Sequence, residues 1–167
     1  MIYYTKIISP IGTLGLVCDD DSLLRIYLPN ENISESTLKE KYPHKNIIEN
    51  KSVFKDTIDQ LTEYFDGKRK VFNIKTKLEI SPFYNKALLE VAKVPYGETS
   101  SYSKIAHKLN NHKATRAVGT ANARNPLPII IPCHRIIAKN GKLGGYAGGL
   151  KMKKYLLNFE IENVNLD

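Results

Sequence analysis

Short apolar runs separated by turn signals dominate the first part of the chain, a pattern typical of strands. Pro10, Gly12 and the acidic triplet 19–21 interrupt runs that are rich in β-branched and aliphatic side chains. Because the interruptions are short, successive runs are expected to pair as a meander. The pattern predicts three strands of a small antiparallel sheet, over residues 2–8, 13–18 and 23–28.

The hydrophobic period changes from Ser52 onward, where apolar residues recur at helical spacing as far as Phe65. Gly67 follows where a helix C-cap is expected. Before this helix, residues 30–50 are polar and mixed and show no clear period. After it, residues 71–80 alternate between apolar and polar side chains, which predicts a further strand.

A domain boundary is indicated at Ser81 and Pro82, because serine is a good N-cap and proline fits the first helical position. The helix that they open carries apolar residues as far as Val91 and has to end before Pro95. We therefore expect two domains, an α/β domain over residues 1–80 and a mainly α domain over residues 81–167.

Two further short helices follow a tight turn at Pro95-Tyr96-Gly97. Ser101 is placed to cap the first of them, and Asn110-Asn111 ends it. The second is predicted from about residue 113 to residue 123. Two short helices joined by a tight polar turn predict a helix-turn-helix, a motif that unrelated proteins also contain.

The second helix of this pair is built mostly from small residues, whereas a helix that reads the DNA major groove carries long polar side chains. The small residues are Ala114, Ala117, Gly119, Thr120, Ala121 and Ala123. They would bring the helix backbone close to a narrow binding partner, or they would allow close packing inside the protein. The residue types alone leave both interpretations open.

Three prolines interrupt the apolar segment 125–135, so this segment is neither a helix nor a central strand. We expect a rigid, buried, extended segment that holds Cys133 in a fixed place. In the loop 144–149, four glycines surround Tyr146, which predicts unusual backbone angles and close backbone approach. The Gly-Lys-Ser/Thr ending of a phosphate-binding loop is missing. A last helix is predicted from Leu150.

Positive charge is concentrated in the second half of the 167-residue chain, whose net charge is +8. Residues 1–81 hold 12 basic and 12 acidic side chains, whereas residues 82–167 hold 13 basic and 5 acidic ones. A basic surface confined to one half is expected of a nucleic-acid binder, although a solvated basic face is the simpler explanation of charge alone. With 42% hydrophobic and 25% charged residues, the composition excludes a disordered or fibrous protein.

The sequence contains no signal for export or for membrane insertion. No apolar run approaches the ~20 residues that cross a bilayer, and residues 1–6 lack the pattern of a secretory signal. We therefore expect a cytoplasmic protein, in which Cys18 and Cys133 are reduced thiols. With four histidines and no paired cysteine spacing, no structural zinc site is expected.

Cys133 is followed directly by His134, and a thiol near a base is a candidate nucleophile because the thiolate is the reactive form. Adjacent residues need not face one another, so a buried structural cysteine is the alternative. Cys18 lies in an apolar predicted strand and is assigned that structural role.

Several motifs of the second half occur in a characteristic order and spacing. They are Pro95-Tyr96-Gly97-Glu98-Thr99 with Ser101-Tyr102, Arg116-Ala117-Val118-Gly119, Asn125-Pro126, Pro132-Cys133-His134-Arg135, the loop from Gly144 to Leu150, Leu156-Leu157 and Glu160. Together they resemble the O6-alkylguanine-DNA alkyltransferase family. The resemblance covers residues 82–162 firmly and residues 54–72 more loosely, and the first 50 residues carry no diagnostic motif.

The resemblance implies a ribonuclease-H-like N-terminal domain without activity of its own, and a DNA-repair reaction in the second domain. The protein would bind double-stranded DNA through the minor groove and flip out a guanine alkylated at O6. It would then take the alkyl group, typically methyl, onto Cys133 in a single irreversible transfer. O4-alkylated thymine is a further candidate substrate. The reaction would need no cofactor, and a monomer would suffice.

The resemblance also assigns catalytic roles. Cys133, His134 and Glu160 would form a proton relay, with a water between the thiol and the imidazole. Tyr102 would rotate the 3′ phosphate and donate a hydrogen bond to N3 of guanine. Arg116 would fill the space that the flipped base leaves.

The remaining candidate residues are assigned to positioning and binding. Asn125 would be a structural hinge before the active-site segment, and Arg135 would form a structural ion pair. The base pocket would be lined by Tyr146, the backbone of Ala147, and the carbonyls of Cys133 and Ile136. Further DNA contacts would come from the helix of small residues, through Ala114, Thr115, Ala117, Gly119 and Thr120.

Two other functions also fit the pattern of residues. One is a non-catalytic helix-turn-helix protein that binds damaged or specific DNA. The other is a thiol hydrolase that uses Cys133 and His134, turns over many times and needs no DNA.

Overall fold

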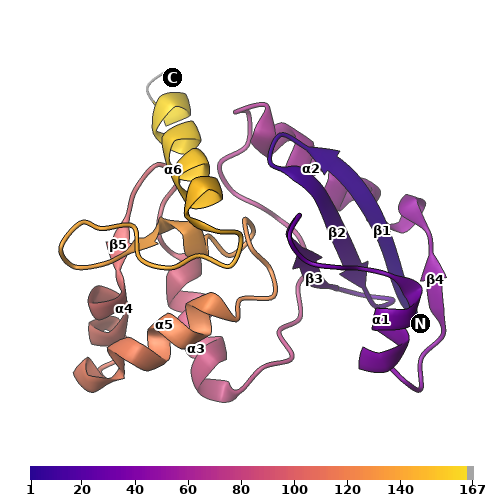
Figure 1. Cartoon of the computed structure of the whole chain (residues 1–167), viewed down its shortest axis with the longest axis horizontal. Coiled ribbons are helices and arrows are strands. Elements are labelled where there is room, and N and C mark those ends of the chain that lie inside the picture. The colour runs from indigo at the N-terminus through magenta and orange to yellow at the C-terminus, as the bar shows by residue number, and fades with distance from the viewer. Residues whose placement is uncertain (165–167) are drawn as a thin grey trace. The chain divides into compact units, whose positions relative to one another are not determined.

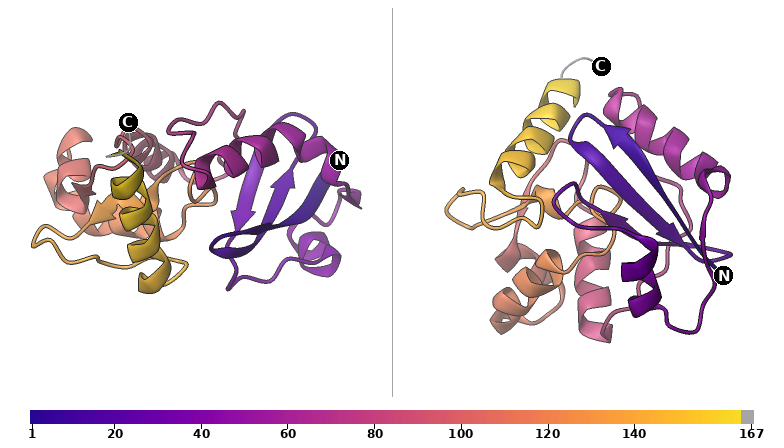
Figure 2. Two further views of the ribbon diagram at one scale, coloured as in Figure 1. Left: turned by 90° about the horizontal axis from the view of Figure 1, so that it is seen from above. Right: turned by 45° about the vertical axis from the view of Figure 1, so that its right-hand side comes forward.

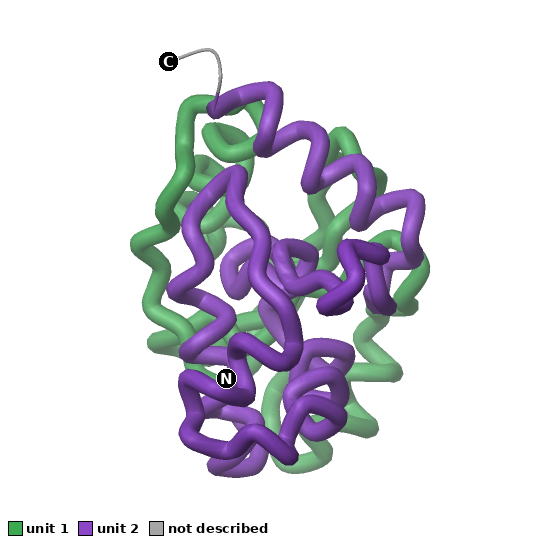
Figure 3. Tube along the Cα trace, turned by 90° about the vertical axis from the view of Figure 1, so that its left-hand side faces the viewer, with its two compact units in different colours: residues 1–78 green, residues 79–167 purple. Residues whose placement is uncertain are grey.

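The computed structural model describes residues 1–164, and the chain forms two compact units, residues 1–78 and 79–167 (Figure 3). Unit 1 is an α/β unit built around one sheet, and unit 2 is mainly helical. The predicted fold class, an α/β domain followed by a mainly α domain with a helix-turn-helix, is therefore confirmed.

The sheet of unit 1 has four strands in the order β3-β2-β1-β4 (Figure 1). The strands are β1 (Ile2–Ser9), β2 (Gly12–Cys18), β3 (Leu23–Tyr27) and β4 (Ile47–Glu49). The first three pair antiparallel, as predicted, with Tyr3 opposite Cys18 and Ser9 opposite Gly12. The fourth strand pairs parallel to β1, so the sheet is mixed rather than antiparallel throughout.

Helices cover both faces of this sheet, as the views in Figure 2 show. They are α1 (Glu35–Lys41), the 3-10 turn η1 (Lys51–Phe54) and α2 (Lys55–Phe65). Leu38 of α1 packs in one buried cluster with Ile2, Val17 and Leu24. Leu14 and Leu16 point to the opposite face by strand alternation and are fully buried there.

Two elements lie within residues 30–50, which showed no clear period: α1 and β4. The signal for α1 is short, because Ser34 and Thr37 form a capping box and only Leu38 of the helix is buried. A single buried position gives no periodicity to detect. The strand β4 is three residues long, which is also too short for an alternation to show.

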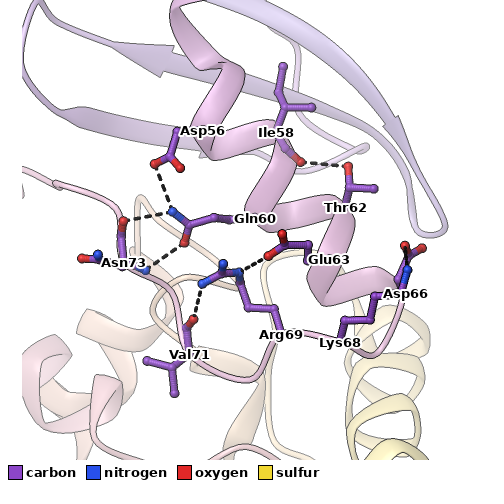
Figure 4. A network of polar contacts seen from close by, with 10 residues as sticks. All are labelled: Asp56, Ile58, Gln60, Thr62, Glu63, Asp66, Lys68, Arg69, Val71 and Asn73. Carbon is purple, nitrogen blue, oxygen red and sulfur yellow. Dashed lines mark hydrogen bonds and ion pairs between the residues drawn. The ribbon is translucent and has the colours of Figure 1, made fainter.

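The strand predicted over residues 71–80 is wrong, because this segment makes only one bridge, between Leu23 and Thr76. Polar side chains of α2 and of the loop that follows it bind the backbone of this segment instead (Figure 4). Gln60 donates to the Asn73 carbonyl over 3.0 Å and accepts from the Asn73 N–H over 2.8 Å. Arg69 pairs with Glu63 and donates to the carbonyl of Val71. The backbone groups at Asn73 and Val71 are thus satisfied by side chains rather than by a strand partner.

Unit 2 begins with α3, which Ser81 caps and Pro82 opens as predicted. Its elements are α3 (Pro82–Ala92), β5 (Ser100–Ser101), α4 (Tyr102–Lys108), η2 (His112–Ala114), α5 (Thr115–Ala123), η3 (Cys133–Arg135), β6 (Ile136–Ile137) and α6 (Leu150–Val164). The helices α4 and α5 pack on one another and on α3, around buried Leu88, Ile105 and Val118. Asn110, with φ 54°, makes the turn between α4 and η2.

The segment before Cys133 is buried but not extended, which corrects the expectation for residues 125–135. The N–H of Ile131 donates to the carbonyl of Leu127, so the chain turns there, and Cys133 begins the 3-10 turn η3. Prolines allow this turn because each fixes φ at a value that turns and 3-10 helices also use.

Candidate functional site

Asn125 fixes the turn that delivers Cys133. Its Nδ2 donates to the carbonyl of Ile131 over 2.8 Å, and its Oδ1 accepts from the N–H of Leu127 over 3.0 Å. Ile129 in this turn has φ 76°, a left-handed conformation that costs a β-branched residue about 1–3 kcal/mol. The hydrogen bonds of Asn125 oppose that strain, and Cys133 is held with an exposed fraction of 2%.

Glu160 of α6 ties together three parts of unit 2. Its Oε1 lies 2.6 Å from Nε2 of His134, and it accepts from Nη2 of Arg135 over 3.0 Å. Its Oε2 accepts from Nε of Arg135 over 2.8 Å and from the N–H of Gly97 over 3.2 Å. His134 and Glu160 are completely buried. The structural ion pair predicted for Arg135 therefore uses the same carboxylate as the histidine.

The hydrogen bonds of His134 identify the ring nitrogen that is able to accept a proton. An ionised carboxylate only accepts hydrogen bonds, so the contact with Glu160 requires the proton of the neutral ring on Nε2. Nδ1 then carries a lone pair, and it makes no hydrogen bond with any residue from 1 to 164. A buried imidazole oriented by a carboxylate, with its other nitrogen unprotonated, is suited to act as a general base.

The protonation states at neutral pH agree with this arrangement. Burial lowers the pKa of His134 below its ordinary 6.5, against the opposite effect of Glu160, so the ring is neutral. Burial by itself would raise the pKa of Glu160, but the hydrogen bonds from His134 and Arg135 and the charge of Arg135 bring this pKa to about 2. The site therefore holds an ionised carboxylate, a neutral base and a guanidinium.

The two cysteines differ in their surroundings, although both are buried. Burial raises the pKa of Cys133 to about 11, while a hydrogen bond from Asn125 and the charge of Lys153 act in the other direction. Burial and the charges of Asp19 and Asp20 raise the pKa of Cys18 to about 12. Cys133 is thus a thiol that needs a base, and only Cys133 has groups nearby that favour the thiolate.

A cavity of about 480 Å³ opens between α5 and the glycine-rich loop. Its lining includes six of the predicted site residues: Tyr102, Thr115, Arg116, Gly119, Tyr146 and Ala147. It also includes Ala123 and Gly145, which were not assigned to the site, and Asn122, which the sequence did not single out. Pockets of roughly 300–1,000 Å³ are the usual size for small molecules, so the cavity is large enough for one base.

Glycines shape the wall of this cavity around Tyr102. Gly144 has φ 68°, and a Cβ there would lie 2.9 Å from the phenol oxygen of Tyr102. Both the backbone angle and this close approach therefore require glycine. On the α5 side, a Cβ at Gly119 would lie 3.8 Å from the Tyr102 ring, which is ordinary contact. The Tyr102 hydroxyl donates to the carbonyl of Gly145 over 3.4 Å.

Of the two uses that the sequence left open for the small residues, the structure shows close packing for some and leaves others exposed. Ala114 and Ala121 are buried and allow close packing inside unit 2. Ala117 and Thr120 are partly exposed, and Ala123 is exposed. Arg116, which is predicted to fill the space left by the flipped base, is exposed at the beginning of α5. The exposed face of α5 thus carries small side chains and, at its N-terminal end, the long cationic side chain of Arg116.

Ile136 does not line the cavity, although its carbonyl was predicted to contact the base. Ile136 is fully buried, and its carbonyl accepts a hydrogen bond from Nζ of Lys153. The carbonyl of Cys133 likewise accepts a bond from Nδ2 of Asn122, over 3.1 Å. Each carbonyl oxygen has two lone pairs, so each has one further position for a donor.

Lys153 and Asn122 are buried polar residues that the sequence pattern did not single out. Lys153 is fully buried, donates to the carbonyls of Ile136 and Gly145, and makes no ion pair with a carboxylate of residues 1–164. Burial lowers its pKa to about 8. The signal was its spacing, because 153, 156, 157 and 160 share one face of α6, so a lysine sits on the apolar side.

Residues 1–164 contain neither a metal-binding cluster nor a membrane-spanning helix. No group of three or more His, Cys, Asp or Glu side chains there is arranged to hold a metal ion. No helix in that range is both long and apolar enough to span a bilayer.

Two family models together match nearly the whole chain. The ribonuclease-like domain of 6-O-methylguanine DNA methyltransferase matches residues 2–78, and the DNA-binding domain of the same enzyme matches residues 82–162.

Individual relatives extend this similarity over full lengths. A Methanosarcina mazei protein named methylated-DNA–protein-cysteine methyltransferase is 42% identical over 164 residues, covering 98% of this chain and 99% of its own. The constitutive enzyme of that name from Bacillus subtilis is 40% identical, with 96% of each chain covered. The crystal structure of Mycobacterium tuberculosis OGT in complex with DNA has a TM-score of 0.86 and 34% identity, covering 96% of this chain and 94% of that one.

Proposed function

Because the chain belongs to the 6-O-methylguanine DNA methyltransferase family, we propose that it repairs duplex DNA by taking an alkyl group from O6 of guanine onto Sγ of Cys133. Its enzyme class is that of the methylated-DNA–protein-cysteine methyltransferases, and its partner is DNA. The observation that carries the residue assignment is that buried Cys133 directly precedes the His134–Glu160 pair and binds, through its carbonyl, Asn122 of the cavity wall.

The transfer begins with activation of the thiol. Nδ1 of His134 takes the proton of Cys133 through a bridging water, and Glu160 stabilises the imidazolium that forms. Lys153, a buried cation close to Cys133, favours the thiolate further. The high resting pKa of Cys133 keeps the thiol protonated until the base acts, which limits reaction with other electrophiles.

The bond changes balance without a cofactor. Sγ attacks the alkyl carbon, the carbon–O6 bond breaks, and its electron pair stays on guanine. Tyr102 supports the leaving guanine by donating a hydrogen bond to N3. The proton that His134 took from the thiol is finally passed to the guanine. A thioether on Cys133 and an unmodified guanine result. Since nothing in this scheme removes the thioether, each molecule acts once.

Binding to duplex DNA would use the open side of α5. Its small residues fit the minor groove, which is about 6 Å wide, better than a helix with long side chains would. The reacting carbon is hidden in the base stack, so the alkylated guanine has to be flipped into the cavity. Exposed Arg116 at the start of α5 would fill the gap. O4-alkylated thymine is a second candidate substrate for the same cavity.

The experiment is a comparison of Cys133→Ala with Cys18→Ala on duplex DNA that contains O6-methylguanine. We expect Cys133→Ala to abolish methyl transfer and to leave DNA affinity unchanged, because the thioether forms only at this thiol. Cys18→Ala is the matched control, since it removes a buried thiol from unit 1, and it should keep full transfer. Methyl transfer by Cys133→Ala would exclude Cys133 as the alkyl acceptor. Loss of methyl transfer in well-folded Cys18→Ala would favour Cys18 instead.

A further inference from the structure

Asn122 is a buried polar residue of α5 that the proposed reaction leaves unused. Its exposed fraction is 5%, and it lines the cavity beside Tyr102. It lies on the buried side of α5 with Val118 and Ala121, where an apolar residue is the usual occupant.

The orientation of its amide is determined by the hydrogen bond that it makes. The carbonyl of Cys133 can only accept, so the group 3.1 Å from it has to be the NH₂ of Asn122. The second hydrogen of this NH₂ is available to Tyr102. Burial raises the pKa of the Tyr102 phenol, and a hydrogen bond from Asn122 acts in the opposite direction.

The other end of the amide makes the side chain costly for the fold. Oδ1 of Asn122 is buried and accepts no hydrogen bond from residues 1–164. A buried acceptor without a partner destabilises a protein, and an apolar side chain of the same size would avoid that loss. A polar residue that is unfavourable for stability and adjoins a reactive thiol points to a role in the reaction.

We propose that Asn122 is a positioning residue for alkyl transfer: its NH₂ orients the Cys133 carbonyl and the Tyr102 phenol toward the flipped base. This inference rests on the proposed function. With one lone pair held by Asn122, the Cys133 carbonyl directs its other lone pair to a donor in the cavity. On O6-alkylguanine the exocyclic 2-amino group is such a donor. Asn122 would therefore sharpen the preference for bases that carry this amine.

The test compares Asn122→Leu, which has nearly the same volume, with wild type and with Asn158→Leu. Asn158 is exposed on α6, so the control makes the same chemical change outside the cavity. We expect Asn122→Leu to unfold at the same or a higher temperature, while its transfer rate falls about tenfold or more, as when one orienting hydrogen bond is lost. The loss should be equal for duplex DNA and for free O6-benzylguanine, because Asn122 acts after flipping.

A second readout separates positioning from a structural role. Wild type should transfer faster from O6-methylguanine than from O6-methylhypoxanthine, which lacks the 2-amino group, and Asn122→Leu should reduce this ratio. Wild-type rate and selectivity in Asn122→Leu would overturn the inference, as would a rate loss that merely follows a lower unfolding temperature. If Asn122→Leu does not fold, Asn122→Ala is measured by the same criteria, and failure of both variants to fold would mark Asn122 as structural. Inactive wild type would refute the proposed function itself.

Discussion

Glu160→Gln is the substitution for which the structure gives the largest predicted effect. The carboxylate accepts two hydrogen bonds from Arg135, one from Gly97 and one from His134, and the bonds with Arg135 and His134 are buried. Glutamine keeps the size but removes the charge, and its NH₂ would face donors that it cannot satisfy. Arg135, with an exposed fraction of 5%, would be left without a counter-ion.

Two independent estimates give the magnitude of this effect. Removing one partner of a buried ion pair costs about 3–5 kcal/mol of unfolding free energy. The fall of the Glu160 pKa from 4.5 to about 2 corresponds to about 3 kcal/mol, at about 1.4 kcal/mol for each tenfold change in proton affinity. At about 2–4 °C per kcal/mol for a chain of this size, we expect the unfolding temperature to fall by about 6–20 °C.

The assay is thermal and urea unfolding followed by circular dichroism at pH 7, with Glu162→Gln as the matched control. Glu162 lies on the same helix but is exposed, so its change should shift the unfolding temperature very little. In the transfer assay, folded Glu160→Gln should also be about 10²–10⁴ times slower than wild type, because His134 loses the carboxylate that orients it. Glu162→Gln should keep the wild-type rate.

The pH dependence of stability provides the refuting result. An acid whose pKa is lowered by folding stabilises the protein above its unfolded pKa, here about 4.5, and that contribution is lost as the pH falls toward 2. Since Gln does not titrate, the stability difference between wild type and Glu160→Gln should shrink from pH 5 to pH 3. A difference that is absent at pH 7, or constant across this range, would refute the reasoning.

Three further predictions concern DNA binding and acid–base chemistry. Arg116→Ala should reduce the rate of transfer from duplex DNA far more than the rate from free O6-benzylguanine, because flipping costs energy only in the duplex. Equal losses in the two rate assays would show that Arg116 does not fill the gap left by the flipped base. With roughly 3–5 phosphate contacts, a plot of log DNA affinity against log salt concentration should have a slope of about −3 to −4.5 in anisotropy titrations. A slope near zero would show that the positive charge of the second half does not bind DNA phosphates. Because burial lowers the pKa of His134, Nδ1 should still be mostly unprotonated at pH 6.5, the ordinary histidine value, and the transfer rate should fall only at lower pH, where a protonated Nδ1 accepts no proton; a rate that rises between pH 7 and pH 5 would contradict this.

The elements with a strong local signal were predictable from sequence. The three long strands, the cap at Ser81 with Pro82, and the cap at Ser101 all lie where the pattern placed them. Residues 71–80 show why alternation alone is insufficient, because a side chain of the preceding helix, Gln60, binds the backbone of this segment. Periodicity carries no information about such a contact.

The functional site was likewise predictable only in part. The motif around Cys133 and the position of Glu160 indicated the relay, but the sequence did not show that Arg135 shares the carboxylate or which nitrogen of His134 is left unprotonated. Both depend on how α6 docks against η3, which is a tertiary contact. Asn122 and Lys153 were missed for a related reason, since a polar residue on a buried face is recognised only once that face is known.

The central claim is that one alkyl group moves from guanine to one thiol, and intact-mass measurement tests it most directly. Wild-type protein is titrated with duplex DNA that contains O6-methylguanine, and the modified peptide is then mapped. We predict that the protein gains the mass of one methyl group, that the gain stops at one per molecule, and that the group lies on Cys133. Catalytic loss of methyl from DNA without a change in protein mass, or a methyl group mapped to another residue, would contradict the account.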